Sequence, residues 1–208
     1  MPSDPLVSCI MPTRGRPEFA QRALEMFQRQ RWPQKELIVC DNATSPSFPN
    51  WARPPHAFRI WDYCGQNIGV LRNYVCSIAH GDFIMHWDDD DFYAPGRIEM
   101  QVRHLIETGR QVTGFRGMMF VDLATGERWK YHASTGAVGV SLCYRRSYWE
   151  SHKFDSVPVA EDGTFARRAE PVAAYEENAG TLIIATIHSG NTSKREPGKH
   201  PRQWQRLP

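Results

Sequence analysis

Residues 7–42, VSCIMPTRGRPEFAQRALEMFQRQRWPQKELIVCDN, decide the fold class of this chain. The stretch begins with a short apolar run at residues 7–11 and ends with a second one at residues 36–40. Between them, apolar residues recur at helical spacing after Pro17, a residue that suits the first position of a helix. A strand, a helix and a strand in this order are typical of a parallel sheet with a right-handed crossover. The stretch therefore predicts an α/β fold.

The rest of the chain continues this pattern in its first half and changes it in the second. Further strands are expected at 58–61 and 83–87, and helices at 67–79 and 95–107. Residues 43–57 are rich in Pro, Ser and Asn and predict a loop. In the second half, strands are expected at 112–121, 128–131, 138–144 and 181–187, with short helices near 147–151 and after 161. We expect one domain with a mixed second half.

Composition limits the class of protein. With 208 residues, 41% of them hydrophobic and 23% charged, the chain has the profile of a soluble globular domain. No apolar run approaches the roughly 18 residues that a membrane-spanning helix needs. The start of the chain lacks the pattern of a signal peptide, so a cytoplasmic location is expected, with peripheral contact to a membrane left open. The net charge of +2 does not by itself indicate a nucleic-acid or membrane partner.

Basic residues gather near the C-terminus. Residues 194–206 hold five Lys or Arg side chains and one Glu. We expect residues 194–208 to form a basic, solvated tail. The alternative is an arm that orders over the phosphates of a ligand or contacts an anionic acceptor.

The five cysteines show no C-x-x-C spacing. Cys9, Cys40 and Cys143 fall within apolar runs that predict strands. Buried, reduced thiols are therefore expected, and neither a disulfide framework nor a zinc site.

The most specific motif is the run of four aspartates from Asp88 to Asp91, directly after the apolar residues 83–87. Four adjacent carboxylates repel one another and lose hydration at the end of a buried strand unless a cation lies among them. Mg²⁺ or Mn²⁺ with hard oxygen ligands is the usual partner, and a diphosphate can complete its shell. On a continued strand, Asp88 and Asp90 would share a face. A solvated acidic loop is the alternative.

Other polar residues are expected at the same edge of the sheet, where ligands bind in open α/β folds. Asp41 ends the second strand and could accept hydrogen bonds from a base or a ribose, although a turn-forming Asp is also common there. The loop after the first strand carries Thr13, Arg14 and Arg16. Arg72 lies near the start of a helix, where an anion is favoured.

A second acidic pair, Glu161 and Asp162, precedes a short predicted helix. A carboxylate at this position can simply cap the helix, or it can act as a general base toward a hydroxyl group. His188 ends the last predicted strand, where it could supply a nitrogen to a metal.

Taken in order, these stretches resemble the inverting glycosyltransferases of family 2, which have the GT-A fold. The resemblance runs from Val7 to Ser193 and includes "VSCIMPTRGRPEF", "ELIVCDNA", "NIGVLRNYVCSIAHGDFIMHWDDDDFYAPGRIE", "SLCYRRSYWE", "VAEDGTFARR" and "IHSGNTS". It implies a Rossmann-like nucleotide-sugar half at about residues 1–95, an acceptor and catalytic half at about 96–193, and a mixed central sheet in a single domain.

The resemblance also implies roles for individual residues. Asp162 would be the catalytic base, and Asp90 and His188 would contact a divalent metal, Mn²⁺ or Mg²⁺. The nucleotide-sugar would be bound by seven residues: Thr13, Arg14, Arg16, Asp41, Arg72, Asp88 and Asp89. Many relatives have a second Asp where this chain has Asn42, which weakens the expectation for base recognition there.

The implied activity is metal-dependent transfer of a sugar, with inversion, from a nucleotide-diphosphate sugar to a hydroxyl acceptor. A UDP-sugar is the favoured donor, and the acceptor is a glycan, a lipid-linked saccharide, a protein or DNA. Three alternatives stay open: a phage-type transferase for hydroxymethylated bases in DNA, a non-catalytic nucleotide-sugar-binding module, and a metal-dependent phosphohydrolase. The oligomeric state is not indicated by the sequence.

Overall fold

A computed structural model describes residues 4–43, 57–60, 66–133, 136–169, 173–175, 182–197, 199 and 201–208, with no side-chain description for 57–60 and 173–175. Most of the loop expected at 43–57 lies outside these residues, as do Trp61, Cys64 and Thr181.

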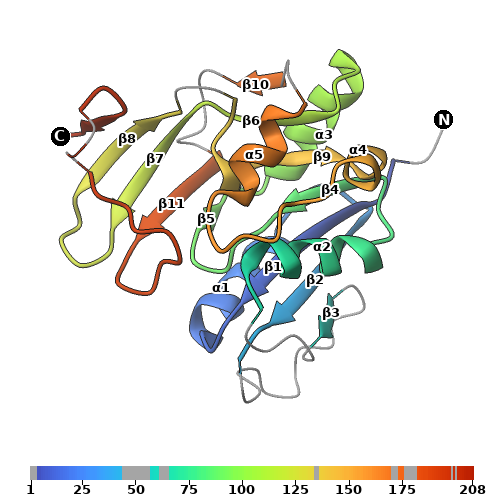
Figure 1. The fold of residues 1–208 in the computed structure, drawn as a ribbon, viewed down its shortest axis with the longest axis horizontal. Helices are drawn as coiled ribbons and strands as arrows, with labels where there is room; N and C mark the ends of the chain where they lie inside the picture. The colour runs from blue at the N-terminus through green and yellow to red at the C-terminus, as the bar shows by residue number, and fades with distance from the viewer. Residues whose placement is uncertain are drawn as a thin grey trace.

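The larger sheet has seven strands in the order β10-β6-β9-β4-β1-β2-β3 (Figure 1). Strands β1, β2, β3 and β4 are parallel, whereas β9 runs antiparallel to both β4 and β6. The sheet is therefore mixed, as expected. Its strands are β1 (Val7–Thr13), β2 (Lys35–Asp41), β3 (Ala57–Ile60), β4 (Phe83–His86), β6 (Val112–Phe115), β9 (Cys143–Arg145) and β10 (Ala173–Tyr175).

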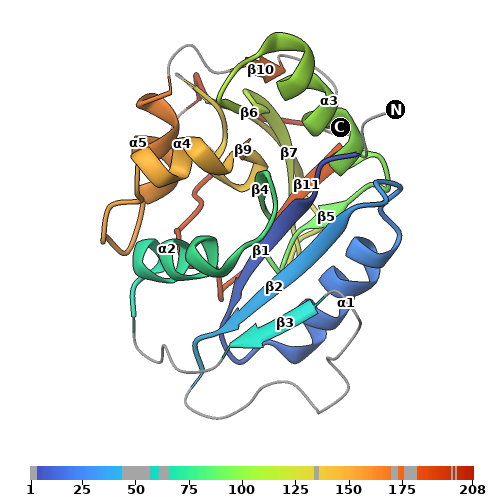
Figure 2. The ribbon, with the colours of Figure 1, turned by 90° about the vertical axis from the view of Figure 1, so that its right-hand side faces the viewer.

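Helices cover both faces of this sheet, which gives two hydrophobic cores (Figure 2). Alternation along β1 divides its side chains between them: Cys9 faces the core under α1 and α3, and Ile10 faces the core under α2, α4 and α5. A strand buried on both faces reads as a continuous apolar run, which explains the sequence of β1. The helices are α1 (Pro17–Gln28), α2 (Ile68–Ile78), α3 (Arg97–Thr108), α4 (Arg146–Ser151) and α5 (Glu161–Arg167).

Local signals explain where these helices begin and end. Pro17 is at the start of α1, and the side chain of Asn67 caps α2 by accepting a hydrogen bond from the Val70 amide at 3.1 Å. Gly109 ends α3 in the left-handed conformation, with φ of 65°.

A second sheet has five strands in the order β12-β8-β7-β11-β5. Its last strand contradicts the expectation of a solvated tail: β12 pairs with β8, and Trp204 is 8% exposed. The indole packs against Phe120 and Tyr131, with ring centroids 5.0 and 4.7 Å away. The strands are β5 (Phe92–Tyr93), β7 (Gly117–Asp122), β8 (Arg128–His132), β11 (Ile183–Ile187) and β12 (Trp204–Arg206).

Two expected strands are wrong in their extent. The run 112–121 is broken at Arg116, which separates β6 in the larger sheet from β7 in the smaller one. Residues 138–144 contain a 3₁₀ turn, η1 (Gly139–Ser141), before β9. There the Ser141 hydroxyl donates to the Val138 carbonyl at 2.5 Å and accepts from the Phe115 amide at 2.8 Å. This local bonding replaces a strand ladder.

Four of the five cysteines, Cys9, Cys40, Cys76 and Cys143, are buried and free, as expected. Within the part of the chain that is described, no helix has the length and apolar character to cross a membrane.

Candidate active site

The acidic turn, Asp88 to Asp91, follows β4 at the carboxyl end of the central parallel strands. The neighbouring strands β1 and β2 end in register with each other, with Thr13 opposite Asp41. Strand β4 stops at His86, so the expectation that Asp88 and Asp90 share a strand face is wrong. The chain turns instead, and cations and other donors meet the carboxylates, with Arg16 shared by Asp89 and Asp90, which lowers their mutual repulsion.

Asp89 is fully buried and bound by residues of the loop after β1. Its carboxylate accepts a hydrogen bond of 2.6 Å from the Thr13 hydroxyl and an ion pair of 2.5 Å from Arg16. Burial raises the pKa of Asp89 to about 7, although Arg16 opposes this shift. Thr13 and Arg16 therefore hold the acidic turn against β1.

Three donors from two segments of the chain meet at Asp90. Its Oδ2 accepts from Arg16 at 2.9 Å, from His188 Nε2 at 3.1 Å and from the Asn191 amide at 3.4 Å. The Nδ1 atom of His188 accepts from the backbone N–H of Gly190 at 3.1 Å, so the ring proton lies on Nε2. His188 thus meets Asp90 although the two residues are 98 positions apart in the chain, and contact of this pair with a metal stays a prediction.

Asp91 has a different role. Its carboxylate is 4% exposed and accepts from the Thr186 amide at 2.9 Å, and the Thr186 hydroxyl donates to the Asp90 carbonyl at 2.9 Å. These bonds attach β11, and with it His188, to the acidic turn. Burial raises the pKa of Asp91 well above the usual range.

Arg72, on the first turns of α2, is 4% exposed and lies between two carboxylates. Its Nε donates to Glu161 at 2.9 Å, and its Nη2 lies 3.4 Å from Asp88. Burial alone would lower the pKa of Arg72, but Asp88 and Glu161 raise it overall. Among the described residues, the buried Nη1 has no hydrogen-bond partner. Glu161 was expected only as half of an acidic pair; the structure gives it the role of orienting Arg72.

Asp162 lies in the first turn of α5 beside a glycine that leaves room for it. One oxygen accepts from the Gly163 amide at 2.6 Å. A Cβ on Gly139 would come within 1.5 Å of the other oxygen, so only glycine fits at this position of η1. The residue before the pair, Ala160, has φ of 66°, a left-handed conformation that is costly for a residue with a side chain.

His86 holds the backbone of Gly139, which contacts Asp162, and it was not anticipated as a site residue. Its Nδ1 donates to the Gly139 carbonyl at 2.8 Å, and the ring is fully buried. Burial lowers its pKa well below the ordinary histidine range, so the ring stays neutral. A histidine inside an apolar strand was the sequence signal that could have identified it.

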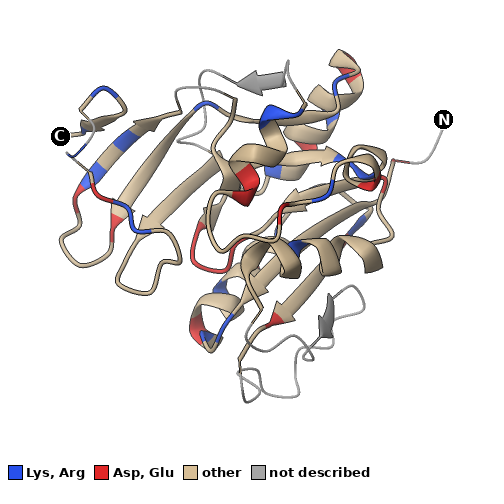
Figure 3. Ribbon diagram, viewed as in Figure 1, with Lys and Arg blue, Asp and Glu red and all other residues tan. Residues whose placement is uncertain are grey.

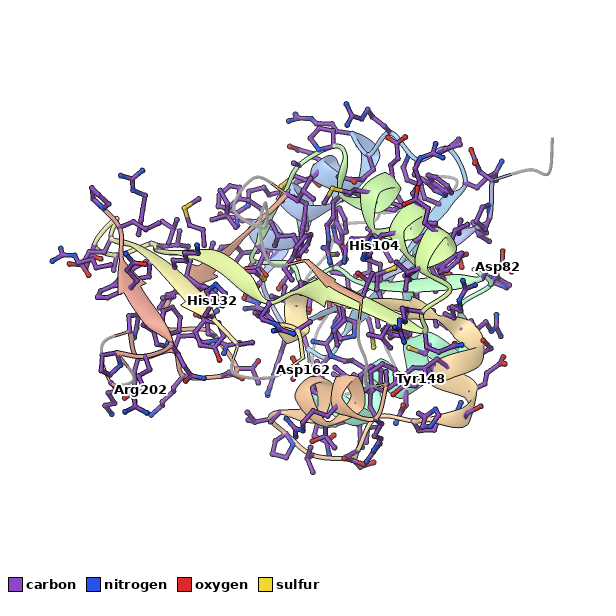
Figure 4. The ribbon with its side chains drawn as sticks, turned by 90° about the horizontal axis from the view of Figure 1, so that it is seen from above. Asp82, His104, His132, Tyr148, Asp162 and Arg202 are labelled. Atoms are coloured by element: carbon purple, nitrogen blue, oxygen red, sulfur yellow. The ribbon has the colours of Figure 1, made fainter. Side chains whose placement is uncertain are left out.

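A cavity of about 540 Å³ joins these groups. Its lining includes the acidic turn, Arg16, Arg72 and the Glu161–Asp162 pair, and one wall is formed by residues 191–195. Figure 3 shows the acidic turn and the acidic start of α5 as separate red segments, and Figure 4 labels Asp162 beside α5, in the lower middle of the view. The structure thus brings together six of the expected residues around one cavity: Arg16, Arg72, Asp88, Asp89, Asp90 and Asp162.

Four expected residues lie outside the described lining of this cavity: Thr13, Arg14, Asp41 and His188, the last of which contacts the lining residue Asp90. Arg14 is exposed. The Thr13 hydroxyl donates to Asp89, which does line the cavity. Asp41 is fully buried, and one of its oxygens accepts from the Ala43 amide at 3.1 Å. Contact of Thr13, Arg14 and Asp41 with a nucleotide stays a prediction. Among the described residues, no group of three or more His, Cys, Asp and Glu side chains is arranged to hold a metal.

Comparison with known proteins places these features in a family. The profile of the family "Glycosyl transferase family 2" matches residues 8–172. A curated relative, the colanic acid biosynthesis protein WcaA of Escherichia coli (strain K12), is 28% identical over 109 residues, which are 50% of this chain and 39% of WcaA.

Two solved structures share the fold. TarS of S. aureus (residues 1–349, with UDP-GlcNAc) has a TM-score of 0.70 at 16% identity, covering 90% of this chain and 60% of TarS. The mannosyltransferase PcManGT of Pyrobaculum calidifontis, with GDP-Man and Mn²⁺, has a TM-score of 0.72 at 14% identity, covering 92% of this chain and 59% of PcManGT. The chain thus spans less than two thirds of each relative, and the expected GT-A fold is confirmed. With the family profile matching most of its length, the chain belongs to glycosyl transferase family 2.

Proposed function

We propose that this protein is a metal-dependent, inverting glycosyltransferase that moves a sugar from a nucleotide-diphosphate sugar to a hydroxyl group of an acceptor. The observation that carries the proposal is one cavity lined by the carboxylates of Asp162 and Asp90 and by the cation of Arg72, with His188 bound to Asp90. A base and an anion-binding group in the same cavity are what direct displacement requires.

Arg72 is the proposed contact for the diphosphate. Its side chain is held by Glu161 and Asp88, so little freedom is lost when a ligand binds. The buried Nη1 without a partner is a donor that a phosphate oxygen would satisfy. Thr13, Arg14, Arg16 and Asp41 are proposed to bind the rest of the nucleotide-sugar, with Asp41 nearest the base.

The Asp90–His188 pair fits a divalent cation. Asp90 Oδ2 lies 3.1 Å from His188 Nε2, so both atoms could contact one ion if the ring proton moved from Nε2 to Nδ1, which would give up the hydrogen bond from the Gly190 amide. Two protein ligands suit Mg²⁺ or Mn²⁺, which commonly complete their shell with water and substrate phosphates. When bound, the cation would offset negative charge on the departing diphosphate.

The chain's own residues supply the other steps. Asp162 accepts the proton of the acceptor hydroxyl, and the acceptor oxygen forms a bond to the anomeric carbon of the donor. The bond from that carbon to the phosphate oxygen breaks, and the nucleoside diphosphate leaves with the electron pair. Attack from the face opposite the diphosphate inverts the anomeric centre, so no protein nucleophile is needed.

The relatives favour a nucleotide-sugar donor. TarS is described with UDP-GlcNAc and PcManGT with GDP-Man and Mn²⁺. We favour a UDP-sugar here. The acceptor, whether a glycan, a lipid-linked saccharide, a protein or DNA, is not indicated by the described cavity.

A thermal-shift panel tests the proposal. UDP, GDP, dTDP and CDP are each added with Mn²⁺, Mg²⁺ or EDTA, because a ligand that binds only the native state raises its melting temperature. One nucleotide is expected to raise the melting temperature with metal and not with EDTA. The same protein is then incubated with sugars of that nucleotide, and release of the nucleoside diphosphate is measured. If the unchanged protein binds the nucleotide but releases no nucleoside diphosphate from its sugars, and if Asp162→Asn behaves in the same way, a non-catalytic binding module would be favoured.

A further inference from the structure

A second cavity, of about 460 Å³, lies between β8 and the C-terminal segment. Three of its lining residues can donate to an anion: Lys130, His132 and Arg202. No Asp or Glu is among the described lining residues. Gly198 and His200 are outside the described part of the chain and are not included in this statement.

The basic side chains of this cavity are presented by regular structure. Lys130 and His132 are two positions apart on β8 and therefore project from the same face of the sheet. Lys130 is paired with Gln205 of β12, and the His132 amide donates to the Gln203 carbonyl at 2.8 Å. Burial of Trp204 holds β12 in place. The segment that carries Arg202 is therefore fixed by the fold.

The cations of this cavity are not neutralised by acidic neighbours. Ion pairs bind two nearby cations, Lys199 to Glu196 and Arg206 to Glu127. By contrast, no ion pair joins Lys130 or Arg202 to a described acidic residue, and both side chains are exposed. The cavity therefore has positive charge that no described acidic residue neutralises.

The second cavity and the active-site cavity share one stretch of chain. Residues 191–195 line the active-site cavity, and residues 201–205 line the second one. Six residues of chain cannot extend beyond roughly 20 Å, so Arg195 and Pro201 lie within that distance. Figure 4 shows Arg202 and Asp162 on the same lower side of the molecule. An extended acceptor could therefore contact both cavities.

From these observations we propose that the cavity of Lys130, His132 and Arg202 binds a phosphate group of the acceptor and so holds the acceptor hydroxyl toward Asp162. That the phosphate belongs to an acceptor rests on the proposed function, whereas the binding of phosphate by this cavity does not. Lys, Arg and His suit a phosphate because it offers several charged oxygens to several donors.

Amide chemical shifts test the site with a defined probe. The ¹⁵N-labelled full chain is titrated with sn-glycerol 1-phosphate, and shifts are expected at residues 130–132 and 203–205. In Lys130→Gln/Arg202→Gln, the loss of two charged donors should weaken binding by about tenfold or more. Both side chains are exposed, so the variant should fold. Arg110→Gln removes an exposed charge outside the lining of this cavity, and this variant should bind sn-glycerol 1-phosphate as tightly as the unchanged protein does.

A vesicle arm separates the two sources of the phosphate. Co-sedimentation with phosphatidylglycerol vesicles, but not phosphatidylcholine vesicles, and its loss in the double variant would assign the phosphate to a lipid headgroup. Binding of soluble glycerol phosphate without co-sedimentation would assign it to a phosphate within a soluble acceptor. Both results support a phosphate site.

Other results would overturn the proposal: no shifts, equal shifts in the double variant, or shifts confined to residues around Arg72. The metal-dependent thermal shift by UDP, measured on the same variants, keeps the two proposals apart. It should be unchanged in Lys130→Gln/Arg202→Gln, and its loss there would assign the second cavity to the donor instead. If the unchanged protein binds phosphate but no nucleotide, the proposed function fails while the phosphate site stands.

Discussion

The contact between Gly139 and Asp162 makes the assignment of the base directly testable. In Gly139→Ala, the new Cβ would lie 1.5 Å from the carboxylate oxygen and 2.1 Å from the carboxylate carbon. An ordinary contact needs about 3.4 Å, so the carboxylate must move by roughly 2 Å or the chain must shift. A displacement of about 1 Å can reduce a rate by 10²-fold. We therefore expect kcat to fall at least 100-fold, with a stability loss of about 1–3 kcal/mol from overpacking.

The assay is release of nucleoside diphosphate from the donor that the thermal-shift panel selects, alongside thermal unfolding. Gly163→Ala is the matched control, because it adds the same methyl group next to Asp162, keeps the amide that donates to it, and meets only the end of Arg167 at 3.4 Å. The control should be as stable as the unchanged protein or more so, since alanine favours a helix by about 1 kcal/mol. Full activity in a folded Gly139→Ala protein would refute the assignment of Asp162 as the base.

Two further predictions concern buried charge. Arg72→Gln should abolish metal-dependent nucleotide binding and lower the urea-derived unfolding free energy by about 3–5 kcal/mol, because it leaves the 4%-exposed side chain of Glu161 without its cation. The double variant Arg72→Gln/Glu161→Gln should recover the unfolding free energy but not nucleotide binding. Normal nucleotide binding by either variant would contradict the role of Arg72. His86 is buried and neutral, and its pKa is lowered in the folded state, so protons bind the unfolded state more readily below the ordinary histidine pKa of about 6.5. The contribution of His86 to the unfolding free energy should therefore fall by up to about 1.4 kcal/mol for each pH unit below that value. The raised pKa of Asp89 acts in the opposite direction, but it does so in the unchanged protein and in His86→Gln alike. Between pH 7 and pH 5, the unfolding free energy from urea titrations should change less favourably in the unchanged protein than in His86→Gln, and the same change in both proteins would contradict the prediction.

The sequence predicted the first half of the fold well because its signals are local. Apolar runs identified β1, β2 and β4, and Pro17 and Gly109 identified the ends of helices. The second half depended on long-range pairing. The separation of β6 from β7 and the pairing of β12 with β8 are set by which sheet each segment joins, and residue patterns do not state that.

In the candidate site, too, local sequence signals identified some residues, whereas contacts between distant parts of the chain were missed. The acidic turn was singled out from the sequence because four carboxylates directly after a buried strand are unusual. Asp162 was singled out because the family resemblance favoured a general base over a simple helix cap. Their partners were not: Glu161 binds Arg72 across 89 positions, and Gly139 meets Asp162 only in the fold. The turn at Asp88 was also missed, because whether a strand continues through four carboxylates depends on the cations that meet them.

The central claim is that Asp90 and His188 hold a divalent cation that assists binding of a nucleoside diphosphate. The most direct measurement is calorimetric titration of Mn²⁺ into the protein with and without UDP, repeated with Asp90→Asn and His188→Gln. We expect Mn²⁺ to bind more tightly with UDP present, and each variant to lose about tenfold or more in Mn²⁺ affinity. Unchanged Mn²⁺ affinity in both variants, or UDP binding that is equally tight in EDTA, would contradict the account.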